Sequence, residues 1–106
     1  MINRLERLEA LAKERPDDAF TLFALAKEYE KSGDLLKSLT VYSDLTRKQP
    51  DYVGTYFHLG KLLEDLDQEE NALNAYETGI SVAKKIGDHH ALAELSNAAQ
   101  NLRLEM

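Results

Sequence analysis

Apolar residues recur at helical spacing along most of the chain, and five short polar stretches interrupt them. Leu22, Leu25, Ala26 and Tyr29 fall three, one and three positions apart, which places them on one face of a helix. Residues 2–14 show a comparable spacing of leucines. The pattern predicts an all-α fold of about six helices without strands. Turns are expected near residues 15–18, 32–34, 49–51, 66–68 and 87–89.

The pattern repeats along the chain with a period of 34 residues. When residues 16–49 are placed over residues 50–83, nine positions carry the same amino acid, whereas about two would match by chance. A fixed period of this length predicts a repeat architecture. The nine identical pairs are Pro16/Pro50, Asp17/Asp51, Thr21/Thr55, Phe23/Phe57, Leu25/Leu59, Lys27/Lys61, Glu30/Glu64, Leu39/Leu73 and Tyr42/Tyr76.

Each repeat is expected to hold two helices with a polar turn between them. In the first repeat, Gly33 can adopt the left-handed backbone that ends a helix, and Asp34 can cap the next helix. Pro50 cannot continue that second helix, and Asp51 offers a cap to the helix that follows. Residues 16–18 and 50–52 are therefore expected to play the same part in the two repeats.

The second repeat departs from the first at its turn and at its end. Asp67 stands where the first repeat has the turn glycine, and aspartate tolerates the left-handed conformation better than most residues. Lys84 stands where a proline would be, so this helix is expected to continue to about Ile86, where Gly87 can end it. It should be the longest helix of the chain. A final helix, over about residues 89–104, is expected to cover the end of the stack.

Small and aromatic residues fall at matching positions of the two repeats. Small residues such as Ala26, Gly60 and Ala72 let neighbouring helices approach closely, and aromatic rings fill the space beside them. The unit resembles the tetratricopeptide repeat (TPR), which is a helix–turn–helix unit of about 34 residues. The resemblance rests on Leu22, Leu25, Ala26, Tyr29, Ser38, Tyr42 and Pro50 in the first repeat, and on Tyr56, Leu59, Gly60, Leu63, Ala72 and Tyr76 in the second.

The resemblance implies an array of antiparallel helix hairpins, an α–α superhelix in which the first helix of each pair lines a concave groove. It divides the chain into a truncated repeat at residues 1–15, full repeats at residues 19–52 and 53–86, and a C-terminal capping helix at residues 88–104. Residues 1–106 together would form a single TPR domain, like that of small stand-alone bacterial proteins.

Composition and charge narrow the classes of function. The net charge of −6 argues against a nucleic-acid binder, which needs clustered lysine and arginine. The absence of cysteine excludes disulfides, thiolate metal sites and thiol catalysis. No stretch is apolar and long enough for a signal peptide or a transmembrane helix, so a cytoplasmic protein that binds no membrane is expected.

No motif for catalysis, cofactor binding or metal binding stands out. The five glycines are scattered rather than gathered in a phosphate-binding loop. The triplet Asp88-His89-His90 is shared with a family of phosphoesterases on a much longer α/β scaffold, and Asp88 is more simply explained as a helix cap. Two adjacent histidines point to different sides of a helix and do not form a metal site. The chain is therefore expected to be non-catalytic and to hold no metal and no cofactor.

The TPR resemblance places one set of first-helix side chains on the groove wall. Two of them, Phe23 and Lys27, recur as Phe57 and Lys61, although helix pairing does not obviously need them. An aromatic ring with a lysine one turn away could hold a peptide or a helix of a partner. The other interpretation is that the two phenylalanines contact each other between neighbouring repeats and belong to the core. The candidate groove residues are Phe20, Phe23, Lys27, Lys31, Phe57, His58, Lys61 and Asp65.

Two functions remain open. The first is a protein-interaction module or scaffold that binds a protein or peptide in the concave groove. The second is a self-assembling, homodimeric protein, because the truncated first repeat leaves one side of the helix in residues 2–14 without its usual partner helix. The mass in solution separates the two, because a monomer with an open groove favours the binder.

Overall fold

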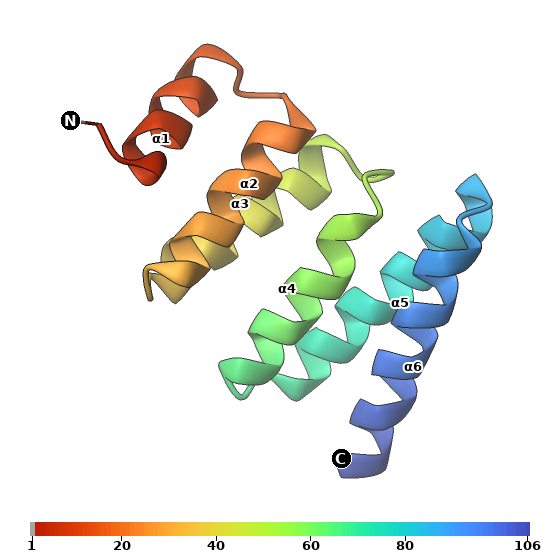
Figure 1. The fold of residues 1–106 in the computed structure, drawn as a ribbon. Coiled ribbons are helices and arrows are strands. Elements are labelled where there is room, and N and C mark those ends of the chain that lie inside the picture. Colours follow the sequence, from red (N-terminus) through yellow and green to blue (C-terminus); the bar gives the residue numbers. More distant parts are fainter. Residues whose placement is uncertain (1) are drawn as a thin grey trace. The chain divides into compact units, whose positions relative to one another are not determined.

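The computed structural model describes residues 2–106, which form six α-helices and contain no strand (Figure 1). The helices are α1 (Arg4–Glu14), α2 (Ala19–Lys31), α3 (Leu35–Lys48), α4 (Gly54–Asp65), α5 (Glu69–Ile86) and α6 (His89–Glu105). The six predicted helices are therefore confirmed. They fall into two compact units, one with α1, α2 and α3 up to Gln49, and one with α4, α5 and α6 from Pro50 onward. That residues 1–106 form a single domain stays a prediction.

In the first unit, α2 packs against both α1 and α3. The apolar face predicted for α2 is buried, including Leu22, Leu25 and the wholly buried Ala26. At Ala26 the helices of the pair come close, because the Ser38 hydroxyl of α3 donates a hydrogen bond to the Ala26 carbonyl oxygen at 2.8 Å. Ala26 and Ser38, the small residues of the first repeat, therefore lie at the crossing of α2 and α3.

In the second unit, α5 packs against both α4 and α6, and α4 also contacts α6. Two glycines mark the closest approaches. A Cβ atom at Gly60 would lie within 2.6 Å of three Tyr76 ring atoms, and one at Gly79 would lie 2.6 Å from Tyr56 Cβ and 2.9 Å from Leu95 Cδ1. Because carbon atoms in contact are normally about 3.5–4.0 Å apart, these crossings favour glycine.

Most of the predicted helix ends are confirmed. Gly33 and Gly87 have φ angles of 84° and 76°, and Asp67 takes the same left-handed conformation with a φ angle of 58°. The Asp34 carboxylate caps α3 by accepting a hydrogen bond from the backbone N–H of Lys37 at 3.2 Å. With 18 residues, α5 is the longest of the described helices, and it ends where the sequence predicts.

The cap predicted for α4 is wrong. Val53 occupies the N-cap position of α4, with a helical backbone and no side-chain hydrogen bond. The Asp51 carboxylate instead accepts hydrogen bonds from Lys85 Nζ at 3.1 Å and 3.2 Å. The aspartate that was expected to cap one helix therefore pairs with the last turn of another.

The missing cap leaves the buried Thr55 hydroxyl without a partner among the described residues. In the first repeat, the Asp18 carboxylate caps α2 by accepting hydrogen bonds from both the backbone N–H and the hydroxyl of Thr21. The second repeat has Tyr52 at the position equivalent to Asp18, and tyrosine is not a capping residue. Thr55, the counterpart of Thr21, is fully buried, and within residues 2–106 its hydroxyl makes no hydrogen bond.

Candidate partner-binding site

A hollow of about 370 Å³ opens on the first unit between α1 and α2. The Phe20 side chain is 71% exposed, and Phe23 is half-buried. A concave surface with exposed aromatic rings is typical of a binding site. The hollow brings together all four groove residues predicted in the first repeat. Its lining residues are Arg4, Phe20, Phe23, Ala24, Lys27, Glu28 and Lys31.

Three cations and one carboxylate line this hollow. The Arg4 guanidinium of α1 contacts the Glu28 carboxylate of α2, with 3.1 Å between Nε and Oε2. Lys27 Nζ lies 5.6 Å from the centroid of the Phe23 ring, which is a cation–π arrangement. Within residues 2–106, neither Lys27 nor Lys31 forms an ion pair. The lining therefore has a surplus of positive charge.

The recurring phenylalanine and lysine belong to a cluster of contacts in the first unit. The Phe23 ring centroid lies 6.1 Å from that of Tyr42 on α3, and the Tyr42 hydroxyl donates a hydrogen bond to Glu30 Oε1 at 2.6 Å. Lys27 lies against the Phe23 ring. These four residues are all among the nine that are identical in the two repeats.

The second unit builds the same cluster from Phe57, Lys61, Tyr76 and Glu64. Lys61 Nζ is again 5.6 Å from the phenylalanine centroid, the Phe57 and Tyr76 rings are 6.4 Å apart, and the Tyr76 hydroxyl donates to the Glu64 carboxylate. Packing within each repeat is therefore a structural reason for the recurrence. Both phenylalanines are half-buried, which leaves part of each ring exposed.

The tyrosines of the two clusters are structural groups rather than acids or bases. Burial, and then the hydrogen bond to a carboxylate, raise the pKa of Tyr42 and the pKa of Tyr76 well above the usual value for tyrosine. Both hydroxyls therefore stay protonated near neutral pH and act as hydrogen-bond donors. Their hydrogen bonds join α3 to α2 and α5 to α4.

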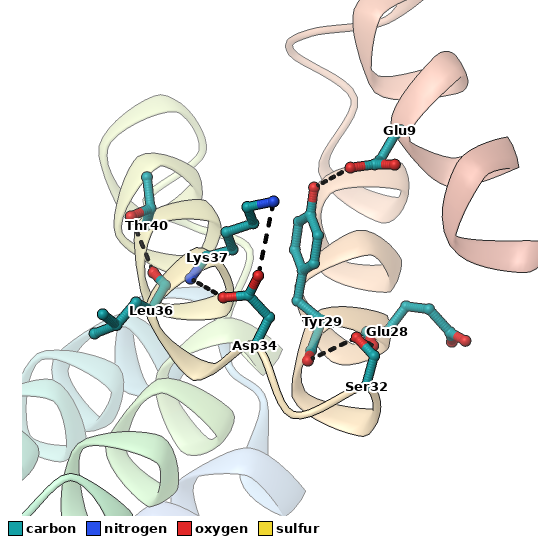
Figure 2. Close-up of polar contacts among 8 residues, drawn as sticks. All are labelled: Glu9, Glu28, Tyr29, Ser32, Asp34, Leu36, Lys37 and Thr40. Carbon is teal, nitrogen blue, oxygen red and sulfur yellow. Dashed lines mark hydrogen bonds and ion pairs between the residues drawn. The ribbon is translucent and has the colours of Figure 1, made fainter.

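A comparable hydrogen bond joins α1 to α2, as Figure 2 shows. The Tyr29 hydroxyl donates to Glu9 Oε2 of α1 at 2.6 Å. Burial and the neighbouring Glu9 carboxylate raise the pKa of Tyr29 to about 12. Lys37 Nζ of α3 lies 5.7 Å from the centroid of the same ring and 3.7 Å from the Asp34 carboxylate. The α1 wall of the hollow is therefore fixed by this bond in addition to its ion pair with α2.

The groove residues predicted in the second repeat lie along α4. The Phe57 and His58 rings are 5.6 Å apart and nearly perpendicular, at 88°. Lys61 and Asp65 are exposed, and Lys61 Nζ lies 3.9 Å from the carboxylate of Glu64. This face therefore offers less unpaired positive charge than the face of the first repeat. That the two sets of residues form one groove stays a prediction.

Two charged lining residues of the hollow were not predicted. Arg4 lies one period before Ser38, at a position where both full repeats carry a small residue. Glu28 corresponds to Leu62 in the second repeat. A charged residue stands at each of these positions where another repeat has a small or an apolar residue. This difference in the alignment of the repeats is the signal by which Arg4 and Glu28 could have been found.

The described part of the chain holds neither a cluster of metal-ligating side chains nor a helix that could cross a membrane. No group of three or more His, Cys, Asp or Glu side chains in residues 2–106 is arranged to hold a metal ion. Over the same residues, no helix combines the length and the apolar content that are needed to cross a membrane. The predicted absence of catalytic residues and of cofactors stays a prediction.

Comparison with known proteins identifies the repeat. A family model described as a tetratricopeptide repeat matches residues 53–86. The crystal structure of a tetratricopeptide repeat domain protein from Salinibacter ruber matches with a TM-score of 0.78 and 42% identity, over 81% of this chain and 96% of that one. The solution structure of a Bordetella parapertussis protein matches with a TM-score of 0.82 and 28% identity, over 99% of this chain and 91% of that one.

A curated relative gives the same family. A TPR repeat-containing protein of Methanocaldococcus jannaschii is 36% identical over 86 residues, which are 78% of this chain and 27% of that protein. The TPR fold in general supports protein–protein interaction, and TPR proteins are typically non-catalytic. The 34-residue period, the paired helices and the small residues at their crossings agree with these matches. The chain belongs to the tetratricopeptide repeat family.

Proposed function

We propose that this chain is a non-catalytic cytoplasmic scaffold that binds a protein or peptide through the first-helix faces of its repeats. Phenylalanine rings supply apolar anchors on these faces, and charged side chains beside them orient the partner. The contact residues in this proposal are Phe20, Phe23, Lys27 and Lys31 of α2, and Phe57, His58, Lys61 and Asp65 of α4.

The observation that carries the proposal is the hollow between α1 and α2. It exposes the Phe20 ring, although moving an aromatic ring of this size out of water is favourable and lowers the free energy. The neighbouring Lys27 and Lys31 make no ion pair within residues 2–106. An exposed ring and unpaired charges in one concavity are groups that a partner can cover and satisfy.

Affinity capture from the source cell, followed by quantitative mass spectrometry, tests the proposal. The parent chain is compared with Phe20→Ala and with the matched control Leu36→Ala, because Phe20 and Leu36 are 71% and 70% exposed. Leu36 lies on α3 and does not line the hollow. A specific partner should be recovered with the parent chain and with Leu36→Ala, and lost with Phe20→Ala.

Titration calorimetry with the captured partner then measures the effect on affinity. A central aromatic anchor is worth about 2 kcal/mol or more, so Phe20→Ala should weaken binding about thirtyfold. Circular dichroism of each variant confirms that it folds. Equal affinities of the parent chain and of Phe20→Ala would place the binding surface elsewhere on the molecule.

The alternative is self-assembly through the terminal helices. Ile2, Leu104 and Met106 are exposed near the two ends of the described chain, and no residue of α1 is fully buried. A second copy could cover these apolar side chains. Light scattering at high micromolar concentration decides between the functions, because a monomeric mass removes the alternative. If a dimer forms, Ile2→Lys and Leu104→Lys should dissociate it.

A further inference from the structure

We infer that the hollow between α1 and α2 selects an internal segment of its partner in which acidic side chains lie about two and four positions from an apolar one. This inference rests on the proposed interaction function and specifies the chemistry of the partner. Recognition is through the side chains of the segment, so a free carboxyl terminus is not needed.

The apolar part of the hollow is at the N-terminal end of α2. Phe20, Phe23 and Ala24 line it, and three and four positions are the spacings that put side chains on one side of a helix. A leucine, isoleucine, methionine or phenylalanine of the partner can lie against both rings. Its burial, together with that of the exposed Phe20 ring, would drive association.

The positive part of the hollow is farther along the same helix. Lys27 and Lys31 lie one and two turns beyond Phe23, which is about 6 Å and 12 Å at a rise of about 1.5 Å per residue. An extended peptide advances about 3.3 Å per residue, so these distances correspond to about two and four residues. The segment is therefore expected to carry Asp or Glu about two and four positions from its apolar residue.

The other two charged residues of the lining, Arg4 and Glu28, form an ion pair. Glu28 carries the one carboxylate among the lining residues, and its Oε2 atom lies 3.1 Å from Arg4 Nε. The two charges offset each other, which leaves Lys27 and Lys31 without a counter-ion in residues 2–106. Partner carboxylates would supply the missing counter-ions, and like charges would be repelled.

The second repeat shows which residues are specific to the first. The phenylalanine–lysine cluster occurs in both repeats, so it does not distinguish them. Phe20 is replaced by Gly54 in the second repeat, and Lys31 is replaced by Asp65. The added aromatic ring and the added positive charge are therefore what give the first unit its preference for a segment that combines an apolar residue with acidic ones.

A protein segment fits the hollow better than a nucleic acid does. The first unit carries nine Lys or Arg and nine Asp or Glu, whereas the second carries four and ten, so the net charge of −6 belongs to the second unit. A chain with this net negative charge repels a phosphate backbone at long range. Within the hollow, the two phenylalanine rings and Ala24 favour an apolar side chain.

Selection from a random peptide library against the full chain tests the inference. Enriched peptides are synthesised with both ends blocked and are titrated by fluorescence anisotropy. We expect them to carry Asp or Glu two and four positions from a large apolar residue. Phe20→Ala should weaken their binding about thirtyfold and Lys31→Glu about tenfold, the latter most strongly at low salt.

Two matched control variants separate the site from general effects. Leu36→Ala removes an equally exposed apolar side chain outside the hollow. Lys13→Glu makes the same charge change as Lys31→Glu, and both lysines lie in the last turn of a helix. Both controls should bind the enriched peptides within about twofold of the parent chain, as expected for surface changes away from a binding site.

The possible outcomes distinguish the inference from the proposed function. If the enriched peptides are neutral or basic, or if Lys31→Glu binds them as the parent does, the inference is wrong and a peptide-binding function stands. If no peptide is enriched, both are contradicted. If a random single-stranded oligonucleotide binds more tightly than the peptides and Lys31→Glu abolishes that binding, the hollow serves a nucleic acid instead.

Discussion

Replacing Gly60 by alanine tests whether α4 and α5 cross as closely as the structure shows. The added Cβ would lie within 2.6 Å of Cε1, Cδ1 and Cζ of Tyr76. The Tyr76 ring is fully buried, and its hydroxyl donates to Glu64, so the ring has little freedom to move. Gly54→Ala is the matched control, because Gly54 lies on the same helix and a Cβ there would meet nothing within 4 Å.

The expected magnitude follows from two opposing effects. Alanine is more favourable than glycine in a helix by about 0.8–1 kcal/mol. Both variants gain part of this stabilisation, so it largely cancels when they are compared. At Gly60 the ring or the helices must move by about 1 Å or more to restore contact distances. Such overpacking costs about 1–3 kcal/mol. The free energy of unfolding of Gly60→Ala should therefore be about 1–3 kcal/mol below that of Gly54→Ala.

Urea unfolding followed by far-UV circular dichroism measures both free energies. The m-values of the two variants should agree, because the same surface is exposed on unfolding. Thermal melts give a second measure, in which about 1 kcal/mol corresponds to a shift of about 4–8 °C for a chain of this size. If Gly60→Ala is as stable as Gly54→Ala, α4 and α5 do not cross closely at Gly60.

Three further predictions concern stability. Thr55→Val should stabilise the protein by about 1 kcal/mol, because it removes a buried hydroxyl that has no partner within residues 2–106, whereas Thr21→Val should destabilise the protein by a similar amount. If urea unfolding gives both variants a change of the same sign, this explanation is contradicted. Asp67→Gly should raise stability by up to about 1 kcal/mol, because a non-glycine residue is strained at a φ angle of 58°, and a lower midpoint in urea contradicts the strain. The pKa of Tyr29 is about 12 in the folded state and near 10 in the unfolded state, so the contribution of the neutral hydroxyl is complete below pH 10 and is lost as the pH rises towards 12. Tyr29→Phe should therefore lose less stability than the parent chain between these pH values, and equal losses contradict the assignment.

The helix bounds could be predicted because the sequence marks most of them chemically. Gly33 and Gly87 take the left-handed backbone conformation that ends a helix, and the Asp34 carboxylate caps α3. Asp51 shows the limit of such reasoning. Its carboxylate forms an ion pair with Lys85, and that contact depends on how the end of α5 lies beside the start of α4. A local pattern of capping residues cannot show whether Asp51 caps α4 or pairs with a lysine of another helix.

The candidate site could be predicted only in part. The alignment of the repeats identified Phe23 and Lys27 because both recur, but it could not show that Phe23 packs on Tyr42. Arg4 was missed because it comes from the truncated repeat, and its reach to Glu28 follows from the packing of α1 on α2. Sequence periodicity gives the face of a helix, whereas the chemistry of a hollow depends on which side chains of the neighbouring helix also border it.

Partners are proposed to bind on the first helices of the repeats, and a map of chemical shift changes on the protein decides this point. The captured partner is titrated into isotope-labelled protein, and backbone amide NMR spectra are recorded. We expect the largest shift changes in α2 (Ala19–Lys31), with further changes in α4 (Gly54–Asp65). Changes confined to α3 (Leu35–Lys48) and α5 (Glu69–Ile86) would contradict this proposal, because the partner would then bind the second helices instead.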